Sequence, residues 1–178
     1  LGVLSILALT GVTSAARAVE PAQPITYTSI RGIHRYETAQ LISQAMFLAT
    51  LPAGGGAVVA PGETFPEALC GAPLAAAYGG PVLLTPKVGL ENGTRAELIR
   101  LQPDTVFVIG LSADIASAIQ TALPGATVVR INGIADNVYD MSHKVALELE
   151  KKVGDMTGAT AIITIGSNFP DAIGVSPL

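Results

Sequence analysis

Two acidic residues stand where an α/β protein could place catalytic carboxylates. Glu67 and Asp171 each follow an apolar run of strand length, and α/β folds bind ligands at the carboxyl ends of their strands. Each also lies three residues after a helix-capping residue, Thr64 or Asn168, with Phe-Pro between them. That spacing is typical of a capping box with proline in the first turn. We therefore interpret all four residues as structural helix caps, with catalysis as the weaker alternative.

A second candidate site is basic and aromatic. Arg31, Arg35 and Tyr36 are grouped where the first helix is expected to begin. Arginine supplies bidentate donors and tyrosine supplies a flat face, so the cluster could hold a phosphate or a sugar. The alternative is that Arg35 pairs with Glu37 or another acid while Tyr36 packs on the core.

Other chemical signatures are missing from the sequence. It contains no GxGxxG, GxxxxGK[ST], GxSxG or HExxH motif. His34 and His143 have no partner at metal-ligand spacing. Cys70 is the only cysteine, which excludes an intrachain disulfide, and we expect a small buried thiol. We expect no catalytic residue, no metal and no cofactor in this segment.

The elements that position these residues follow from short, uninterrupted apolar runs, typical of strands buried on both faces. Strands are expected at 57–60, 82–85, 105–109, 127–131 and 161–164, with helical patterns between them. Apolar stripes are expected at Ala39, Ile42, Met46 and Ala49, and at Met141, Val145, Leu149 and Val153. Further caps are expected at Thr94, in a box with Glu97, and at Ser112. The alternation predicts an α/β fold with a parallel sheet and helices on both faces, a Rossmann-like or Toprim-like unit.

Bulk composition limits the partners and the location of the chain. Its net charge is −4 with a pI of about 5.0, so no overall field attracts nucleic acid or an anionic membrane. The apolar run at 1–12 is too short to span a bilayer. We interpret residues 1–18 as a signal peptide that lacks its basic n-region, cleaved after Ala18, and residues 19–29 as a linker. The alternative for the first run is an ordinary buried strand or helix.

The sequence contains an internal duplication. Phe65-Pro66-Glu67-Ala68-Leu69 returns 104 residues later as Phe169-Pro170-Asp171-Ala172-Ile173, and the flanking apolar run and Pro-Leu pair return with it. A unit of that length can bury its own core. We therefore predict one unit at 30–126 and a second, incomplete unit at 127–178.

Several motifs in order carry a resemblance to a known family. They are Arg35-Tyr36-Glu37-Thr38-Ala39, Gly62-Glu63-Thr64-Phe65-Pro66-Glu67-Ala68-Leu69, Ala72-Pro73-Leu74-Ala75-Ala76, Pro81-Val82-Leu83-Leu84-Thr85 and Val108-Ile109-Gly110. Together they resemble the cell-wall-binding repeat 2 family of Gram-positive bacteria. His34 and Glu67 stand where the family has Asp, and Leu111 replaces a Gly. In the second unit the equivalent of Arg35 is lost.

The resemblance implies a secreted, cell-surface protein anchored non-covalently to an anionic wall polymer, teichoic-acid-like or another polysaccharide. It implies tandem repeats packed around a pseudo-threefold axis. It also adds Pro81, Val82, Leu83 and Leu84 to the candidate polymer-binding residues Arg31, Arg35 and Tyr36. By the residues alone that segment is a buried strand, so substitutions there could abolish anchoring by unfolding the unit. The alternatives are an exported α/β enzyme acting on wall glycan or peptide, with activity in a separate domain, and a purely structural repeat.

Overall fold

The computed structural model describes residues 27–158, 162–168 and 170–171. The expected signal peptide and most of the expected linker lie outside these residues. Within them, a parallel sheet is formed by β1 (Gly56–Pro61), β2 (Val82–Thr85), β3 (Thr105–Ile109) and β4 (Thr127–Ile131), in the order β2-β1-β3-β4. The helices are α1 (Arg35–Met46), α2 (Pro66–Ala77), α3 (Asn92–Leu101), α4 (Ala113–Ala122), the short 3-10 helix η1 (Ile134–Asp136) and α5 (Val138–Val153).

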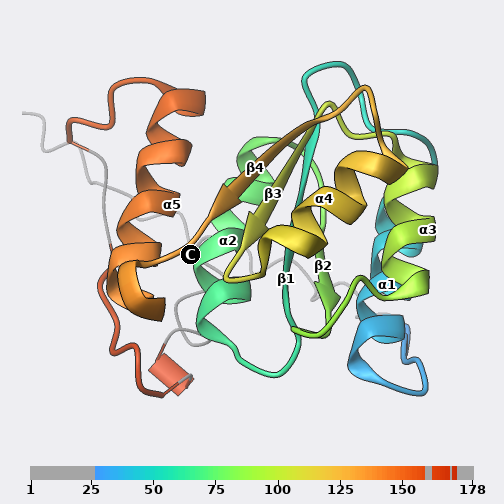
Figure 1. The fold of residues 1–178 in the computed structure, drawn as a ribbon, viewed down its shortest axis with the longest axis horizontal. Coiled ribbons are helices and arrows are strands. Elements are labelled where there is room, and N and C mark those ends of the chain that lie inside the picture. Colours follow the sequence, from blue (N-terminus) through green and yellow to red (C-terminus); the bar gives the residue numbers. More distant parts are fainter. Residues whose placement is uncertain (1–26, 159–161, 169, 172–178) are drawn as a thin grey trace, which may run out of the picture.

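Two apolar layers enclose the sheet, one on each face. Alternate strand residues point to opposite faces, so Val59 and Val108 pack against α3 and α4, whereas Val58 and Phe107 pack against α2 and α5. Figure 1 shows the sheet between these two pairs of helices. The predicted α/β class with a parallel sheet covered on both faces is confirmed.

Helix α5 closes the second face of the sheet. Met141 and Val145 are each 3% exposed and Leu149 packs beside them, as the stripe predicted. Near the end of the helix, Lys152 Nζ lies 4.3 Å from the centre of the Tyr78 ring and donates to the Gly54 carbonyl at 3.3 Å. Helix α5 is therefore fixed to the β1–β3 sheet along most of its length.

The stripe predicted for α1 is not the buried face of that helix. Ile42 is 46% exposed and Met46 is 72% exposed, while Ser43 is the residue that is buried. The physical reason is polar: the inward side of α1 carries Ser43, whose hydroxyl donates to the Glu97 carboxylate on α3.

Two of the four expected caps are wrong. At α2, Phe65 occupies the N-cap position without a side-chain capping bond, so the box of Thr64 and Glu67 is not formed. At α3, Glu91 is the N-cap and accepts from the amide of Thr94 at 3.0 Å. Thr94 instead donates its hydroxyl to the Leu84 carbonyl, because tertiary contacts outweigh the local box.

The cap at the start of α4 is confirmed. The Ser112 hydroxyl accepts from the amide of Ile115 at 3.4 Å. The caps expected at Asn168 and Asp171 stay predictions, because Phe169 and residues 172–178 lie outside the described residues.

The sheet continues past the expected repeat boundary at 126/127. Strand β4 pairs with β3 from Thr105–Thr127 to Ile109–Ile131. The strand expected at 161–164 does not form over residues 162–164, where Ile163 is 94% exposed. No described strand pairs with this segment, and Ile162 and Ile165 are each about half exposed. In the described part of the chain, no helix has both the length and the apolar character needed to cross a membrane.

Candidate functional site

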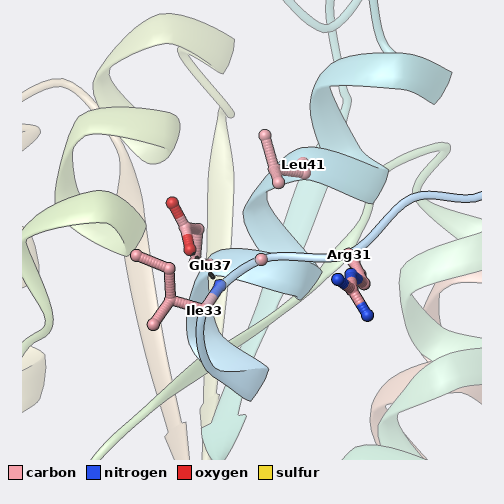
Figure 2. Close-up of a pocket in the computed structure, with 5 residues that line it drawn as sticks. Arg31, Ile33, Glu37 and Leu41 are labelled. Atoms are coloured by element: carbon pink, nitrogen blue, oxygen red, sulfur yellow. Dashed lines mark hydrogen bonds between the residues drawn. The ribbon is translucent and has the colours of Figure 1, made fainter.

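The loop before α1 forms an open pocket. Arg31, Gly32, Ile33, Glu37 and Leu41 line a hollow of about 480 Å³ (Figure 2). Arg31 is exposed, and among the described residues it has no hydrogen-bond or ion-pair partner. The pocket therefore offers a guanidinium without a protein partner beside the side chains of Ile33, Glu37 and Leu41. A free guanidinium suits an anionic or sugar-like ligand.

Three local hydrogen bonds hold this loop against the first turn of α1. The Gly32 amide donates to Thr38 Oγ1 at 3.0 Å, and the Ile33 amide donates to the Glu37 carboxylate. The amide of Glu37 donates back to the ring of His34, which is the N-cap, at 3.2 Å. The predicted start of this helix near Arg35 agrees with α1, but the role of His34 as the N-cap was not predicted.

Arg35 and Tyr36 both contact the backbone at the end of strand β1. Arg35 Nη1 donates to the carbonyl of Gly62, directly after β1. The Tyr36 ring lies so close to Gly62 that a Cβ added there would clash with its Cε1. Loss of solvent, the charge of Glu63 and a hydrogen bond to Glu63 raise the Tyr36 pKa, although Arg35 opposes them. These two residues therefore support the edge of the sheet near the pocket.

Gly62→Ala is expected to lower the free energy of unfolding by about 1–2 kcal/mol, because the new methyl group displaces Tyr36. A matched control is Gly125→Ala, where an added Cβ meets nothing within 4 Å. Urea denaturation followed by far-UV circular dichroism measures both. Equal stabilities for the two variants would show that the Tyr36–Gly62 contact carries no packing constraint.

Of the segment 81–84, Pro81 precedes the edge strand β2 and the other three residues belong to it, and α1 packs against this strand. Pro81 and Leu83 are buried, while Val82 and Leu84 are half-buried. The Leu84 carbonyl also accepts from Thr94 at 2.6 Å. A fully buried Leu83 side chain cannot meet a polymer directly, so a substitution there acts first on the fold.

Glu67 is buried, with 6% of its surface exposed. Its Oε2 has no hydrogen-bond partner among the described residues, and its Cγ lies against Gly110, whose φ is +67°.

Burial, followed by the charge of Glu67, raises the pKa of the neighbouring Cys70 thiol to about 12, which keeps it protonated and weakly nucleophilic. Over the described residues no group of three or more His, Cys, Asp or Glu could hold a metal ion.

The start of α5 repeats the geometry of the start of α1. The amide of Ile134 donates to Asp140 Oδ2 at 2.7 Å, as Ile33 does to Glu37. Tyr139 lies against Gly166 as Tyr36 lies against Gly62, with an added Cβ 2.8 Å from the ring. Tyr36 and Tyr139 are 103 residues apart and the two glycines are 104 apart.

The sequence signal for this second helix start was partly hidden. Ile33 and Glu37 are four residues apart, whereas Ile134 and Asp140 are six apart. The two extra residues form the η1 turn, in which Ala135 has a φ of 49°. With this register Val138 stands at the position of Arg35, so the strand-end arginine is lost, as the alignment indicated.

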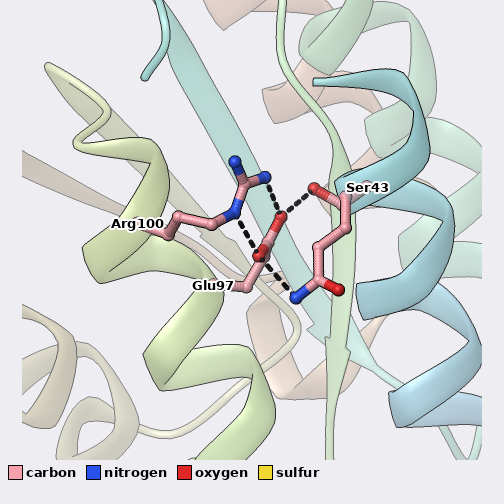
Figure 3. A network of polar contacts seen from close by, with 4 residues as sticks. Ser43, Glu97 and Arg100 are labelled. Atoms are coloured by element: carbon pink, nitrogen blue, oxygen red, sulfur yellow. Dashed lines mark hydrogen bonds and ion pairs between the residues drawn. The ribbon is translucent and has the colours of Figure 1, made fainter. Parts of the chain in front are cut away.

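A buried carboxylate connects α1 to α3. Glu97 Oε1 accepts from Ser43 Oγ and from Arg100 Nη2, both at 2.6 Å, and Oε2 accepts from Arg100 Nε at 2.8 Å and Gln44 Nε2 at 3.3 Å (Figure 3). Burial alone would raise the Glu97 pKa, but hydrogen bonds from Arg100, Ser43 and Gln44 together hold it below its usual value. Sequence reasoning missed this network because Glu97 fitted a capping box.

The fold is an α/β module with a parallel four-stranded sheet, and the start of α1 is repeated in geometry at the start of α5. The model of the family described as cell wall binding domain 2 (CWB2) matches residues 29–120. That match covers more than half of the chain, which therefore belongs to the cell wall binding domain 2 family.

Individual relatives agree with the family. N-acetylmuramoyl-L-alanine amidase LytC of Bacillus subtilis (strain 168) is 27% identical over 84% of this chain and 27% of its own length. The Amidase enhancer of the same organism is 29% identical over 82% of this chain and 19% of its own. The solved structure of Cwp6 from Clostridium difficile matches with a TM-score of 0.61 and 28% identity, over 79% of this chain and 23% of that one. The chain thus spans about a quarter or less of each relative.

Proposed function

We propose that this chain anchors an exported protein non-covalently to the bacterial cell wall through an anionic wall polymer, teichoic-acid-like or another wall polysaccharide. The family match carries the wall-binding part of the proposal. The exposed, unpartnered Arg31 in its pocket supports the anionic ligand, because the chain as a whole has a net charge of −4 and offers no general attraction to anions.

Within this proposal the candidate residues have different parts. Arg31 contacts the polymer, whereas Arg35 and Tyr36 hold the end of β1 beside the pocket. Helix α1 packs against strand β2, which contains Val82, Leu83 and Leu84 and follows Pro81. Polymer binding should therefore be most sensitive to Arg31 without loss of the fold.

Arg31→Gln is expected to weaken co-sedimentation with Gram-positive walls several-fold while leaving the melting temperature unchanged, since no partner is lost. The matched control is Arg95→Gln, an exposed cation on α3 outside the pocket. Binding should fall as salt is raised, because few exposed charge pairs are screened. Undiminished binding to walls stripped of their anionic polymers would contradict the proposal.

Repeat packing forms part of the proposal. With the 103-residue register, Ile42 and Met46 on α1 correspond to Val145 and Leu149 on α5, which pack on the α2 side of the sheet. The exposed stripe of α1 is thus chemically equivalent to a stripe that is covered in the second unit. We infer that an α2 face of a further repeat covers it, which is the contact that pseudo-threefold packing needs.

The location and the domain limits are proposals of the same kind. We infer secretion to the surface of a Gram-positive bacterium with residues 1–18 as signal peptide, and repeats at 30–126 and 127–178. Two relatives are named as an amidase and an amidase enhancer, so the alternative is a wall-degrading enzyme whose activity resides in another domain. Digestion of purified peptidoglycan by residues 27–178 alone would overturn the assignment of this segment as non-catalytic.

A further inference from the structure

A second groove lies between β4 and α5. It encloses about 470 Å³ and is lined by Arg130, Ile131, Asn132, Lys144, Leu147, Glu148, Glu150 and Lys151. It overlaps the equivalent of the Arg31 pocket: Asn132 corresponds to Arg31, one residue before the Gly-Ile pair, and Lys144 corresponds to Leu41 in the 103-residue register. Two of its lining residues are therefore equivalent to residues of the first pocket, so the two hollows overlap in part.

The second groove is richer in cations than the first. Three basic side chains face two acidic ones among its lining residues, within a chain of net charge −4. Lys144 Nζ is held by Asp140 at 2.8 Å and by the Asn132 carbonyl at 2.9 Å, and Lys151 is held by Glu148 at 2.6 Å. These pairs fix the positions of the ammonium groups but leave them exposed.

Arg130 is the cation with most donors to spare. Its Nε donates to the Leu111 carbonyl at 2.8 Å, and its Nη2 lies 3.1 Å from the Asn132 amide oxygen in the side-chain orientation that satisfies both groups. A guanidinium has five N–H donors, so donors remain after these two contacts. Arg130 is thus oriented by the protein and still able to bind an anion.

The groove stays open when the unit around it is complete. In the first unit, whose sheet is present, the residues equivalent to Asn132 and Ile134 are Arg31 and Ile33, and both are exposed. The equivalent of Leu147 is Gln44, which is half-buried and donates to Glu97 on α3, whereas the equivalent of Lys151 is Leu48, which is exposed. A completed second unit would therefore cover Leu147 and leave the cationic rim accessible.

We propose that this groove is a second binding subsite for the anionic wall polymer, in which Arg130 and Lys151 contact its phosphate or carboxylate groups. The inference rests on the proposed function. It places one subsite in each repeat, so that a polymer with regularly spaced anions is held at two points. Lys144 is a positioning residue, since it ties the loop at Asn132 to α5.

The test compares two double variants by isothermal titration with poly(glycerol phosphate) and, separately, with polyglucuronate. Arg130→Gln with Lys151→Gln is expected to weaken binding about fivefold or more, the effect of losing a charge-assisted contact. Lys87→Gln with Arg95→Gln removes the same charge from exposed positions outside both hollows and should change binding less than twofold. The polymer that loses more affinity identifies phosphate or carboxylate as the bound group.

Arg130→Lys controls for folding, because it keeps the charge, and it should retain most of the binding if the melting temperature is unchanged. Equal effects of the two double variants would overturn the second subsite. If the wild-type chain binds walls, and Arg31→Gln weakens that binding while the groove variant does not, the subsite alone fails. If the wild-type chain binds neither polymer nor walls, the proposed function itself fails.

Discussion

Val145→Asp is expected to lower the free energy of unfolding by about 3 kcal/mol or more. Val145 is 3% exposed and shares an apolar cluster with Leu74 and Phe107. The substitution removes about 1.5–3 kcal/mol of side-chain burial and adds a carboxylate without a partner in an apolar layer. Urea denaturation followed by far-UV circular dichroism measures the loss.

Leu147→Asp is the matched control on the same helix. Leu147 is 42% exposed, so the new carboxylate remains in water and the change should stay within about 1 kcal/mol. A similar loss in both variants would mean that α5 contributes through helix propensity and not through its contact with the sheet. A large difference would show that a helix from the second sequence repeat belongs to the core of the first.

Glu97→Gln is expected to cost about 2 kcal/mol at neutral pH. Breaking a buried ion pair costs about 3–5 kcal/mol, and Arg100 is 33% exposed, so solvent screening reduces that figure. The Glu97 side chain itself is fully buried, and it loses charge-assisted bonds to Ser43 and Arg100. Thermal and urea unfolding should both report the loss, and Glu150→Gln on the exposed side of α5 should not.

The same substitution predicts a pH dependence of definite sign. Because the folded-state pKa of Glu97 lies below the ordinary glutamate value of 4.5, its stabilisation is complete above that value and is lost as the pH falls through the folded pKa. The stability difference between wild type and Glu97→Gln should therefore shrink on acidification below about pH 4.5. A difference that grows on acidification would contradict the assignment of Glu97 as an ionised, hydrogen-bonded carboxylate.

The strands were predictable because their signal is burial itself. The runs at 82–85, 105–109 and 127–131 coincide with β2, β3 and β4, since apolar and β-branched residues dominate them. Arg130 is the exposed exception in β4. Helix starts were less predictable where a capping residue had a tertiary partner. Thr94 bonds to β2 and Glu97 to α1, and neither contact has a local signature.

In the candidate site, too, residue types were predictable from the sequence and tertiary partners were not. Arg31 was found by residue type and occupies an open pocket, but the sequence could not separate it from Arg35, whose partner is a backbone carbonyl 27 residues away. The groove at Arg130 was missed because two extra residues after Ile134 shift the register of the second unit. Its cations come from β4 and α5, which only the fold brings together.

Strand β4 and helix α5 have a consequence for how the chain folds as it is made. Both lie beyond the expected boundary of the first repeat at 126/127, yet β4 pairs with β3 and α5 covers the second face of the sheet. A chain emerging from a ribosome or a translocon presents its N-terminus first, so the first unit cannot close until residues up to about Val153 have appeared. The core of the first unit is then completed during synthesis only when β4 and α5 of the following segment pack onto it.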